Sequence, residues 1–179
     1  MKVFVAGAKA ITKLAPAVQE RLSSICDKGY CVIVGDCAGI DTEVQRFYAG
    51  IGYRNVTVYA CNGKARNNVG NNEIKTVLVR PGISGFEYYQ QKDIAMASDA
   101  DFGYMIWNCK SRGTLCNIIE LVKQGKQTVV YLDNLDLTLL LKSPQDLETM
   151  LTQYAPETRK VFYKAFYPQT ETVQTKLSS

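Results

Sequence analysis

A short polar run at residues 108–114 has the composition of an anion-binding loop. It follows an apolar stretch, 102–107, which is too short for a helix and rich in aromatic side chains, as expected of a buried strand. Beyond the run, apolar residues recur at helical spacing until Gly125. The run therefore leads into a helix N-terminus, where free backbone N–H groups and the positive end of the helix dipole favour a phosphate. The hydroxyl, guanidinium and amide groups for this role come from Ser111, Arg112, Gly113 and Thr114.

The same residues also have a purely structural interpretation, in which the polar run caps the helix and Arg112 is simply solvated. Because the run lies inside a strand–helix–strand unit, we favour phosphate binding and include Asn108 and Lys110 in the candidate site. Trp107 ends the strand, and two roles are open for it. It packs in the core, or it stacks on a base with its indole N–H available to a polar partner.

A glycine-bearing turn at residues 35–41 is the second candidate for ligand contact. It reads Gly35-Asp36-x-x-Gly39-x-Asp41 and follows an all-apolar strand. Glycines permit a tight turn and a close backbone approach to a ligand, and a carboxylate accepts hydrogen bonds from ribose hydroxyls. The alternative is a plain turn in which Asp41 caps the next helix. The pattern is not Gly-x-Gly-x-x-Gly, so hydride transfer with a dinucleotide is not supported.

The order of strand, glycine-bearing turn, helix and strand recurs three times, which predicts an α/β fold with a mainly parallel sheet of about five strands. Ligands of such sheets bind outside the carboxyl ends of the strands. The turns expected to meet there are Gly7 with Lys9, 35–41, 62–72 and 108–114. The 62–72 loop, with Arg66 and Asn67, is more typical of solvated chain unless it folds over this edge. A strand at 73–80 is expected at an edge of the sheet.

The chain divides by composition into three parts. Residues 1–132 form the predicted α/β domain. Residues 133–167 are expected to form a helical extension, because Ser143 with Pro144, and later Pro156, mark helix starts. Residues 168–179 are mostly Thr, Gln and Ser, and we expect a flexible tail.

The composition excludes several classes of function. The 179 residues carry a net charge of +4, spread along the chain, so a nucleic-acid partner is not expected. The absence of histidine removes histidine-based triads and the common metal sites. The six cysteines include no Cys-x-x-Cys pair, and we expect neither a metal site nor a required cofactor. No apolar run approaches membrane-spanning length and no signal peptide is apparent, so we expect a cytoplasmic protein.

At these motifs the chain resembles the SLOG superfamily, whose Rossmann-like three-layer domains bind nucleotide-derived ligands, and above all its YspA-like branch. The likeness covers residues 1–132. Its motifs are Gly-x-x-x-Gly-x-Asp, then Arg/Lys-Asn/Asp-x-x-Met, Ala-Asp and Arg-Gly-Thr. The matching residues here are 35–41, 92–96, 100–101 and 112–114.

The resemblance implies a binding site that lacks an obvious nucleophile. Cytokinin-activating phosphoribohydrolases and nucleoside deoxyribosyltransferases carry a glutamate where this chain has Asn117. Asp93 matches the aspartate that contacts the nucleoside in the transferases, and Met96 belongs to the same motif. The structural alternatives are that Asp93 is an exposed carboxylate on a helix and that Met96 packs in the core. An amide cannot replace a carboxylate nucleophile, but it can bind a ribose hydroxyl or a base edge. We therefore expect a nucleotide or an NAD-derived nucleotide such as ADP-ribose, held by a homo-oligomer.

Two alternatives remain open from the sequence. In the first, the protein cleaves or transfers an N-glycosidic bond of a nucleoside or nucleotide, with a carboxylate from Asp93, Asp36 or Asp41. In the second, which has precedent in the SLOG superfamily, it binds single-stranded nucleic acid, although the scattered basic residues make this the weaker alternative.

Overall fold

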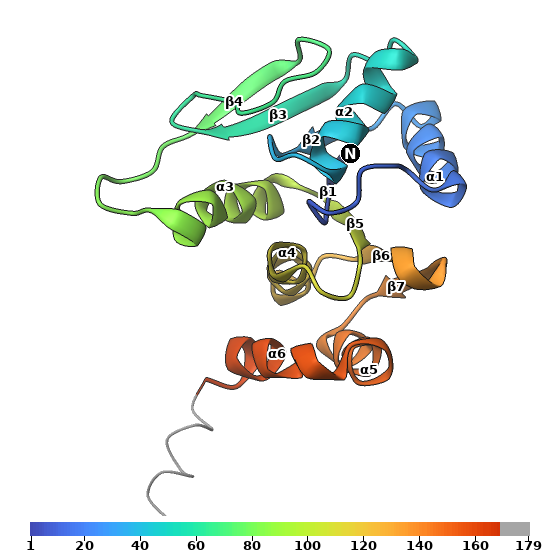
Figure 1. The fold of residues 1–179 in the computed structure, drawn as a ribbon, viewed down its shortest axis with the longest axis vertical. Helices are drawn as coiled ribbons and strands as arrows, with labels where there is room; N and C mark the ends of the chain where they lie inside the picture. The colour runs from blue at the N-terminus through green and yellow to red at the C-terminus, as the bar shows by residue number, and fades with distance from the viewer. Residues whose placement is uncertain (169–179) are drawn as a thin grey trace, which may run out of the picture.

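The apolar stretches of the sequence become the strands of one seven-stranded sheet in the computed structural model, which describes residues 1–168 (Figure 1). The order across the sheet is β4-β3-β2-β1-β5-β6-β7. All neighbouring strands are parallel except β6 and β7, which are antiparallel. The strands are β1 (Lys2–Gly7), β2 (Cys31–Val34), β3 (Val56–Cys61), β4 (Glu73–Val77), β5 (Phe102–Trp107), β6 (Thr128–Leu132) and β7 (Leu137–Leu141).

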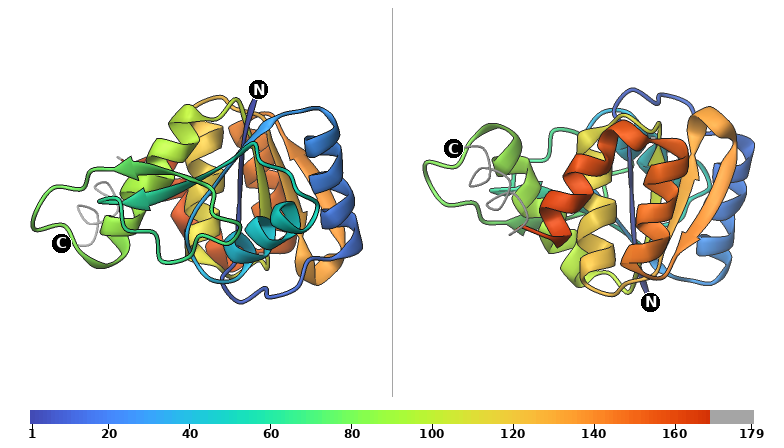
Figure 2. Two further views of the ribbon diagram at one scale, coloured as in Figure 1. Left: turned by 90° about the horizontal axis from the view of Figure 1, so that it is seen from above. Right: turned by 90° about the horizontal axis from the view of Figure 1, so that it is seen from below.

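Helices cover both faces of the sheet and create two buried cores, which accounts for the almost unbroken apolar character of the central strands (Figure 2). On one face lie α1 (Pro16–Asp27) and α2 (Ile40–Gly50). The other face carries α3 (Gly85–Asp99) and α4 (Arg112–Lys123), with α5 (Pro144–Tyr154) and α6 (Arg159–Phe166) packed beside α4. The predicted α/β class is therefore confirmed, as a Rossmann-like arrangement of three layers with seven strands rather than about five.

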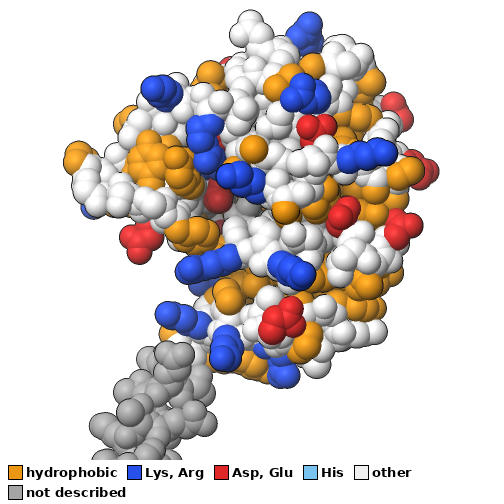
Figure 3. Space-filling view, in the orientation of Figure 1, with side chains coloured by type: hydrophobic (Ala, Val, Ile, Leu, Met, Phe, Trp, Pro, Cys, Tyr) orange, Lys and Arg blue, Asp and Glu red, His pale blue; other side chains and the backbone are white. Residues whose placement is uncertain are grey.

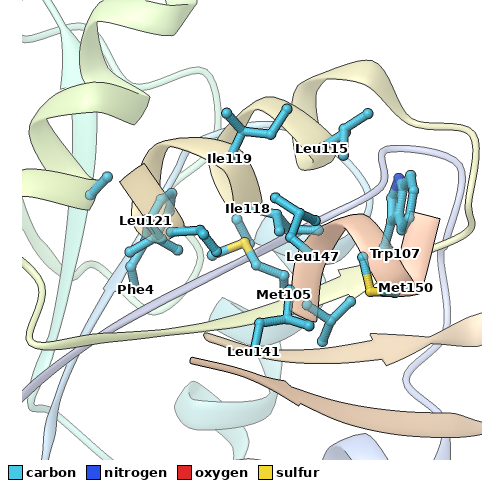
Figure 4. Close-up of a cluster of buried hydrophobic side chains, with 14 of the residues drawn as sticks. Phe4, Met105, Trp107, Leu115, Ile118, Ile119, Leu121, Leu141, Leu147 and Met150 are labelled. Atoms are coloured by element: carbon cyan, nitrogen blue, oxygen red, sulfur yellow. The ribbon is translucent and has the colours of Figure 1, made fainter. Parts of the chain in front are cut away.

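The core on the face covered by α3 to α6 joins the C-terminal helices to the sheet (Figure 4). Phe4 and Met105 from the central strands meet Ile118 of α4, and Leu147 and Met150 of α5 close the cluster. Each such side chain contributes roughly 1.5–3 kcal/mol by leaving water. Because α5 shares this core, residues beyond 132 stabilise the sheet directly.

Strand β7 was not expected, since residues 133–167 were predicted to be helical. The run Leu137–Leu141 is apolar at four of its five positions and pairs with β6 after a short 3₁₀ turn, Asp133–Leu135. The helix starts in this part are confirmed: the Ser143 hydroxyl accepts a hydrogen bond from the Asp146 N–H at the start of α5, and Pro156 opens a 3₁₀ turn (Pro156–Thr158) before α6. The tail predicted at 168–179 lies, beyond its first residue, outside the described residues.

Strand β1 lies where the order of strand addition reverses: β2 to β4 are added on one side of β1, and β5 to β7 on the other. From β1 the chain runs outward through β2 and β3 to β4, which is the predicted edge strand, and then returns to the opposite side of β1 as β5. The connections after β1 and β5 therefore diverge, leaving a crevice at the carboxyl ends of these two strands, where open α/β sheets bind ligands. Within residues 1–168, no helix has the length and apolar character needed to cross a membrane.

Candidate functional site

A pocket of about 300 Å³ lies at the carboxyl ends of β1 and β5. This volume is at the lower end of the range for small-molecule sites. The two glycine-bearing turns and the start of α4 meet here, so the predicted convergence on one edge is confirmed. The predicted site residues that line the pocket are Gly7, Lys9, Asp41, Arg66, Asp93, Met96, Ser111, Gly113, Thr114 and Asn117. The remaining lining residues were not among the predicted site residues: Ala6, Cys37, Phe86, Tyr89 and Lys92.

The glycines of the 35–41 turn make room for protein groups instead of a ligand, which corrects the expectation for both. A Cβ atom on Gly35 would overlap the Asp41 carboxylate and lie 3.1 Å from the Lys92 ammonium nitrogen. Gly39 has a φ of +80°, and a Cβ there would collide with the Lys9 backbone. Asp41 does not cap α2, because its Oδ2 accepts a hydrogen bond from the Cys37 N–H at 3.1 Å, four residues back.

Lys92 is the buried cation of the pocket; it belongs to the 92–96 motif of the sequence, but no role was predicted for it. Its side chain is 4% exposed, and Nζ lies 2.6 Å from Asp93 Oδ1 and 3.9 Å from Asp36 Oδ1. Burial opposes the charge, yet the carboxylates of Asp93, Asp41 and Asp36 outweigh it and raise the pKa of Lys92. Lys92 therefore carries a positive charge beneath the pocket.

Asp36 holds the 62–72 loop over the edge of the sheet and does not line the pocket, contrary to expectation. It accepts hydrogen bonds from the Arg66 guanidinium, at 2.6 Å on Oδ1 and 3.2 Å on Oδ2, and from the Arg66 N–H at 3.0 Å. Asn67 is a second anchor, because its side-chain amide donates to the Asp36 carbonyl oxygen at 2.9 Å. The loop thus folds over the carboxyl ends of the strands, the condition under which it could form part of a site.

The two aspartates of the turn differ in their readiness to ionise. Burial alone would raise the pKa of Asp36, but the hydrogen bonds from Arg66 and the charge of Lys92 hold it below its usual value. Burial raises the pKa of Asp41 to about 7, although Lys92 acts in the opposite direction. Near neutral pH the pocket therefore contains a carboxyl that can both donate and accept a hydrogen bond.

At the start of α4, Ser111 caps the helix, which was one of the two roles considered for this segment, and two backbone N–H groups remain without a partner. The Ser111 hydroxyl accepts from the Thr114 N–H at 3.4 Å and from the Thr114 hydroxyl at 3.0 Å. Among the described residues, the backbone N–H groups of Arg112 and Gly113 have no hydrogen-bond partner. These donors lie at the positive end of the helix dipole, beside the pocket.

Four residues of the 107–112 segment that were candidates for ligand contact do not line the pocket. Trp107 is fully buried, and its indole N–H donates to the Ser111 carbonyl oxygen at 3.0 Å, so core packing is correct and base stacking is wrong. Asn108 orders the turn by accepting from the N–H groups of Lys110 and Ser111. Lys110 is exposed outside the pocket. The Arg112 guanidinium is also outside, 4.6 Å from the centre of the Phe86 ring.

Asn117 is the polar side chain of the pocket whose hydrogen-bonding capacity is unused. It is 8% exposed, lines the pocket, and makes no side-chain hydrogen bond to any other residue in the range 1–168. Among residues 1–168, Arg159 Nε is the only fully buried side-chain nitrogen or oxygen without a partner, so the amide group of Asn117 opens into the pocket rather than being sealed in the core. A ligand that offers both donors and acceptors could therefore form the hydrogen bonds that the Asn117 amide does not make within the protein.

An aromatic wall formed by Phe86 and Tyr89 faces the pocket from the first turns of α3. The Arg66 guanidinium lies 4.0 Å from the centre of the Tyr89 ring. A sequence pattern could have revealed this wall, since Asp93 and Met96 were already candidates. Positions 86, 89, 93 and 96 share one face of a helix.

Comparisons with known proteins add no family to this description: no protein-family model matches the chain, and no curated protein matches it. The residues that the structure describes contain no group of three or more His, Cys, Asp or Glu side chains able to hold a metal ion. On the face shown in Figure 3, lysine and arginine side chains lie scattered among uncharged ones rather than in one continuous stripe. The chemistry of the site must therefore be judged from the pocket itself.

Proposed function

We propose that this protein binds a nucleotide, or a nucleotide derived from NAD such as ADP-ribose, in the pocket at the carboxyl ends of β1 and β5. One observation carries the proposal: the start of α4 and the polar side chains of Asp41, Asp93 and Asn117 line the same pocket. A helix N-terminus suits a phosphate, and carboxyl and amide groups suit ribose hydroxyls or a base edge. A nucleotide combines these groups in one molecule.

The parts of the ligand follow from the charges around the pocket. The phosphate belongs at Gly113 and Thr114, which line the pocket beside the unpaired backbone N–H groups of Arg112 and Gly113. The sugar hydroxyls belong toward Asp41 and Asp93, because carboxylates attract hydroxyl donors and repel a phosphate. The positive charge of Lys92, 2.6 Å from Asp93, offsets part of the repulsion between these carboxylates and a phosphate.

Recognition without turnover is the form of this function that the site supports best. The resemblance to the SLOG superfamily places Asn117 where related enzymes carry a glutamate, and an amide does not serve as a carboxylate nucleophile. Sensing or sequestering a nucleotide signal requires binding alone.

The test is calorimetric titration with nucleosides, mono-, di- and triphosphates, NAD and ADP-ribose, preceded by mass spectrometry of any ligand that copurifies. We expect one or more nucleotides to bind, and the Asn117→Ala variant to bind them about tenfold more weakly, because the ligand loses a buried hydrogen-bond partner. Asn55→Ala is the matched control, since Asn55 donates to the Gly29 carbonyl oxygen at the opposite end of the sheet. Absence of binding across the panel would refute the proposal.

A second candidate function, cleavage of an N-glycosidic bond, is favoured by the position of Asp93. This carboxylate lines the pocket and is held by Lys92 at 2.6 Å. Incubation with the same panel, followed by chromatography for released base, separates the two functions. Release that is abolished in Asp93→Ala supports the enzyme, whereas binding without release supports the sensor.

A further inference from the structure

We propose that Phe86 and Tyr89 form the surface on which the base of the ligand stacks, so that this site selects ligands with a planar heteroaromatic ring over sugar phosphates. The inference rests on the proposed function and assigns the stacking role that Trp107 cannot fill. It also moves that role from β5, none of whose residues lines the pocket, to α3.

The lining of the pocket combines two chemically different sets of side chains. The polar set is Asp41, Lys92, Asp93, Thr114 and Asn117, which offer hydrogen bonds and charge. The apolar set is the Phe86 and Tyr89 rings with Met96, all from α3. A sugar phosphate would satisfy the polar set and leave the rings in water. A nucleotide covers both sets, because its base has an apolar π-face and its sugar and phosphate are polar.

The two rings are accessible and yet held in place. Phe86 is 40% exposed and Tyr89 is 39% exposed, so apolar ring surface remains for a ligand to cover. A guanidinium lies over each ring, Arg112 over Phe86 and Arg66 over Tyr89. Because Arg66 is itself fixed by the two-pronged ion pair with Asp36, the Tyr89 ring is restrained before any ligand binds. Such preorganisation lowers the entropic cost of stacking.

Asn117 provides an independent reason to expect a ligand in this pocket. The residue is more than nine-tenths buried, its side chain is unpaired among residues 1–168, and it lines the pocket together with the aromatic wall. The rings alone would also fit a protein partner. An unpaired amide in the wall of a pocket of about 300 Å³ fits a small molecule instead.

The experiment compares ligands with and without a base on wild-type protein and a double variant, Phe86→Ala with Tyr89→Ala. The probes are AMP, ADP-ribose and ribose 5-phosphate, titrated by calorimetry. We expect the double variant to lose about a hundredfold in affinity for the base-containing probe that the wild type binds, on the order of tenfold for each ring. Its affinity for ribose 5-phosphate should change less than twofold. Tyr89→Phe should keep the wild-type preference, because the π-face is retained.

Tyr163→Ala is the matched control, since it removes an exposed tyrosine on α6, away from the pocket. Thermal unfolding of each variant verifies the fold, and both rings are exposed enough for truncation to be tolerated. Equal losses for probes with and without a base, or no loss for either, would overturn the stacking surface while leaving nucleotide binding intact. If wild-type protein binds none of the three probes nor any nucleotide of the larger panel, the proposed function fails and this inference fails with it.

Discussion

Charged side chains gather at both ends of the sheet, and the two clusters differ in how completely they are satisfied. At the amino end, the Asp99 carboxylate accepts hydrogen bonds from the Tyr59 hydroxyl and from Lys75 Nζ at 2.6 Å, and Lys2 Nζ lies 3.6 Å away. The hydrogen bonds from Lys75 and Tyr59 lower the pKa of Asp99 to about 2. This cluster needs nothing further, and its role is to join β3, β4 and α3.

At the carboxyl end, several groups remain incomplete. Lys92 lies among three carboxyl groups, Asp41 has a pKa raised to about 7 by burial, and Asn117 has no partner in the described chain. Groups that only stabilise a fold are normally satisfied within it, whereas a binding site keeps capacity for its ligand at some cost in stability. The contrast between the clusters is the physical reason for proposing a binding site at the carboxyl end.

The largest expected difference between the two clusters comes from removing one lysine in each. Lys92→Met leaves buried carboxylates without their cation and should lower the free energy of unfolding by about 3–5 kcal/mol. Lys75→Met, the matched control, removes a side chain that is 50% exposed and should cost about 1 kcal/mol or less. Urea denaturation of both variants at pH 7 measures the difference. Equal losses of unfolding free energy would show that Lys92 stabilises the fold no more than a lysine in a surface ion pair does.

A smaller effect, visible in its pH dependence, is expected for Asp41→Asn. The raised pKa of Asp41 means that the folded protein binds more protons than the unfolded chain between about pH 4 and pH 7. The stability that this group contributes is therefore present at low pH and lost as pH rises through about 7, by at most about 1.4 kcal/mol per pH unit. The difference in unfolding free energy between variant and wild type should accordingly move in favour of the variant from pH 5 to pH 8. Parallel stability curves would contradict the raised pKa.

The smallest effect is expected for Asp99→Asn at the amino end. Because the pKa of Asp99 is lowered, its contribution has the opposite sign: it is present above about pH 4 and lost as pH falls toward 2. Solvent screens this carboxylate, so the variant should lose about 1 kcal/mol or less at pH 7. The loss should shrink between pH 5 and pH 3 in urea titrations. A loss as large as that of Lys92→Met would remove the contrast between the two ends.

The sequence predicted the sheet and the edge at which the glycine-bearing turns meet, because both depend on local pattern. Apolar strands ending in glycine-bearing turns indicate a parallel sheet, and a parallel sheet brings those turns to one edge. Strand β7 was not predicted, because a run of only five residues shows too little periodicity to be recognised as a strand. The clear helix starts at Ser143 and Pro156 dominated the prediction for residues 133–167.

The side chains that complete the site could not be predicted in the same way. Lys92 lies on a helix, where a lysine is normally solvated, and Asp36 and Asp41, two of its three carboxyl neighbours, are more than fifty residues earlier in the chain. Trp107 shows the same limit, because strand periodicity does not say whether the last residue faces the core or the edge. Pairings of this kind are set by tertiary packing.

The loop between β3 and β4 connects the outermost strand to the candidate site. Parallel neighbours are usually joined through a helix that packs on the sheet, but residues 62–72 cross without one. Asp36 fastens this crossover from the adjoining turn, through Arg66 and Asn67. The same arginine lies over the Tyr89 ring at the mouth of the pocket. One arginine therefore serves both structures: loss of Arg66 would remove an anchor of the crossover that leads to the border strand and, at the same time, the guanidinium that covers the Tyr89 ring.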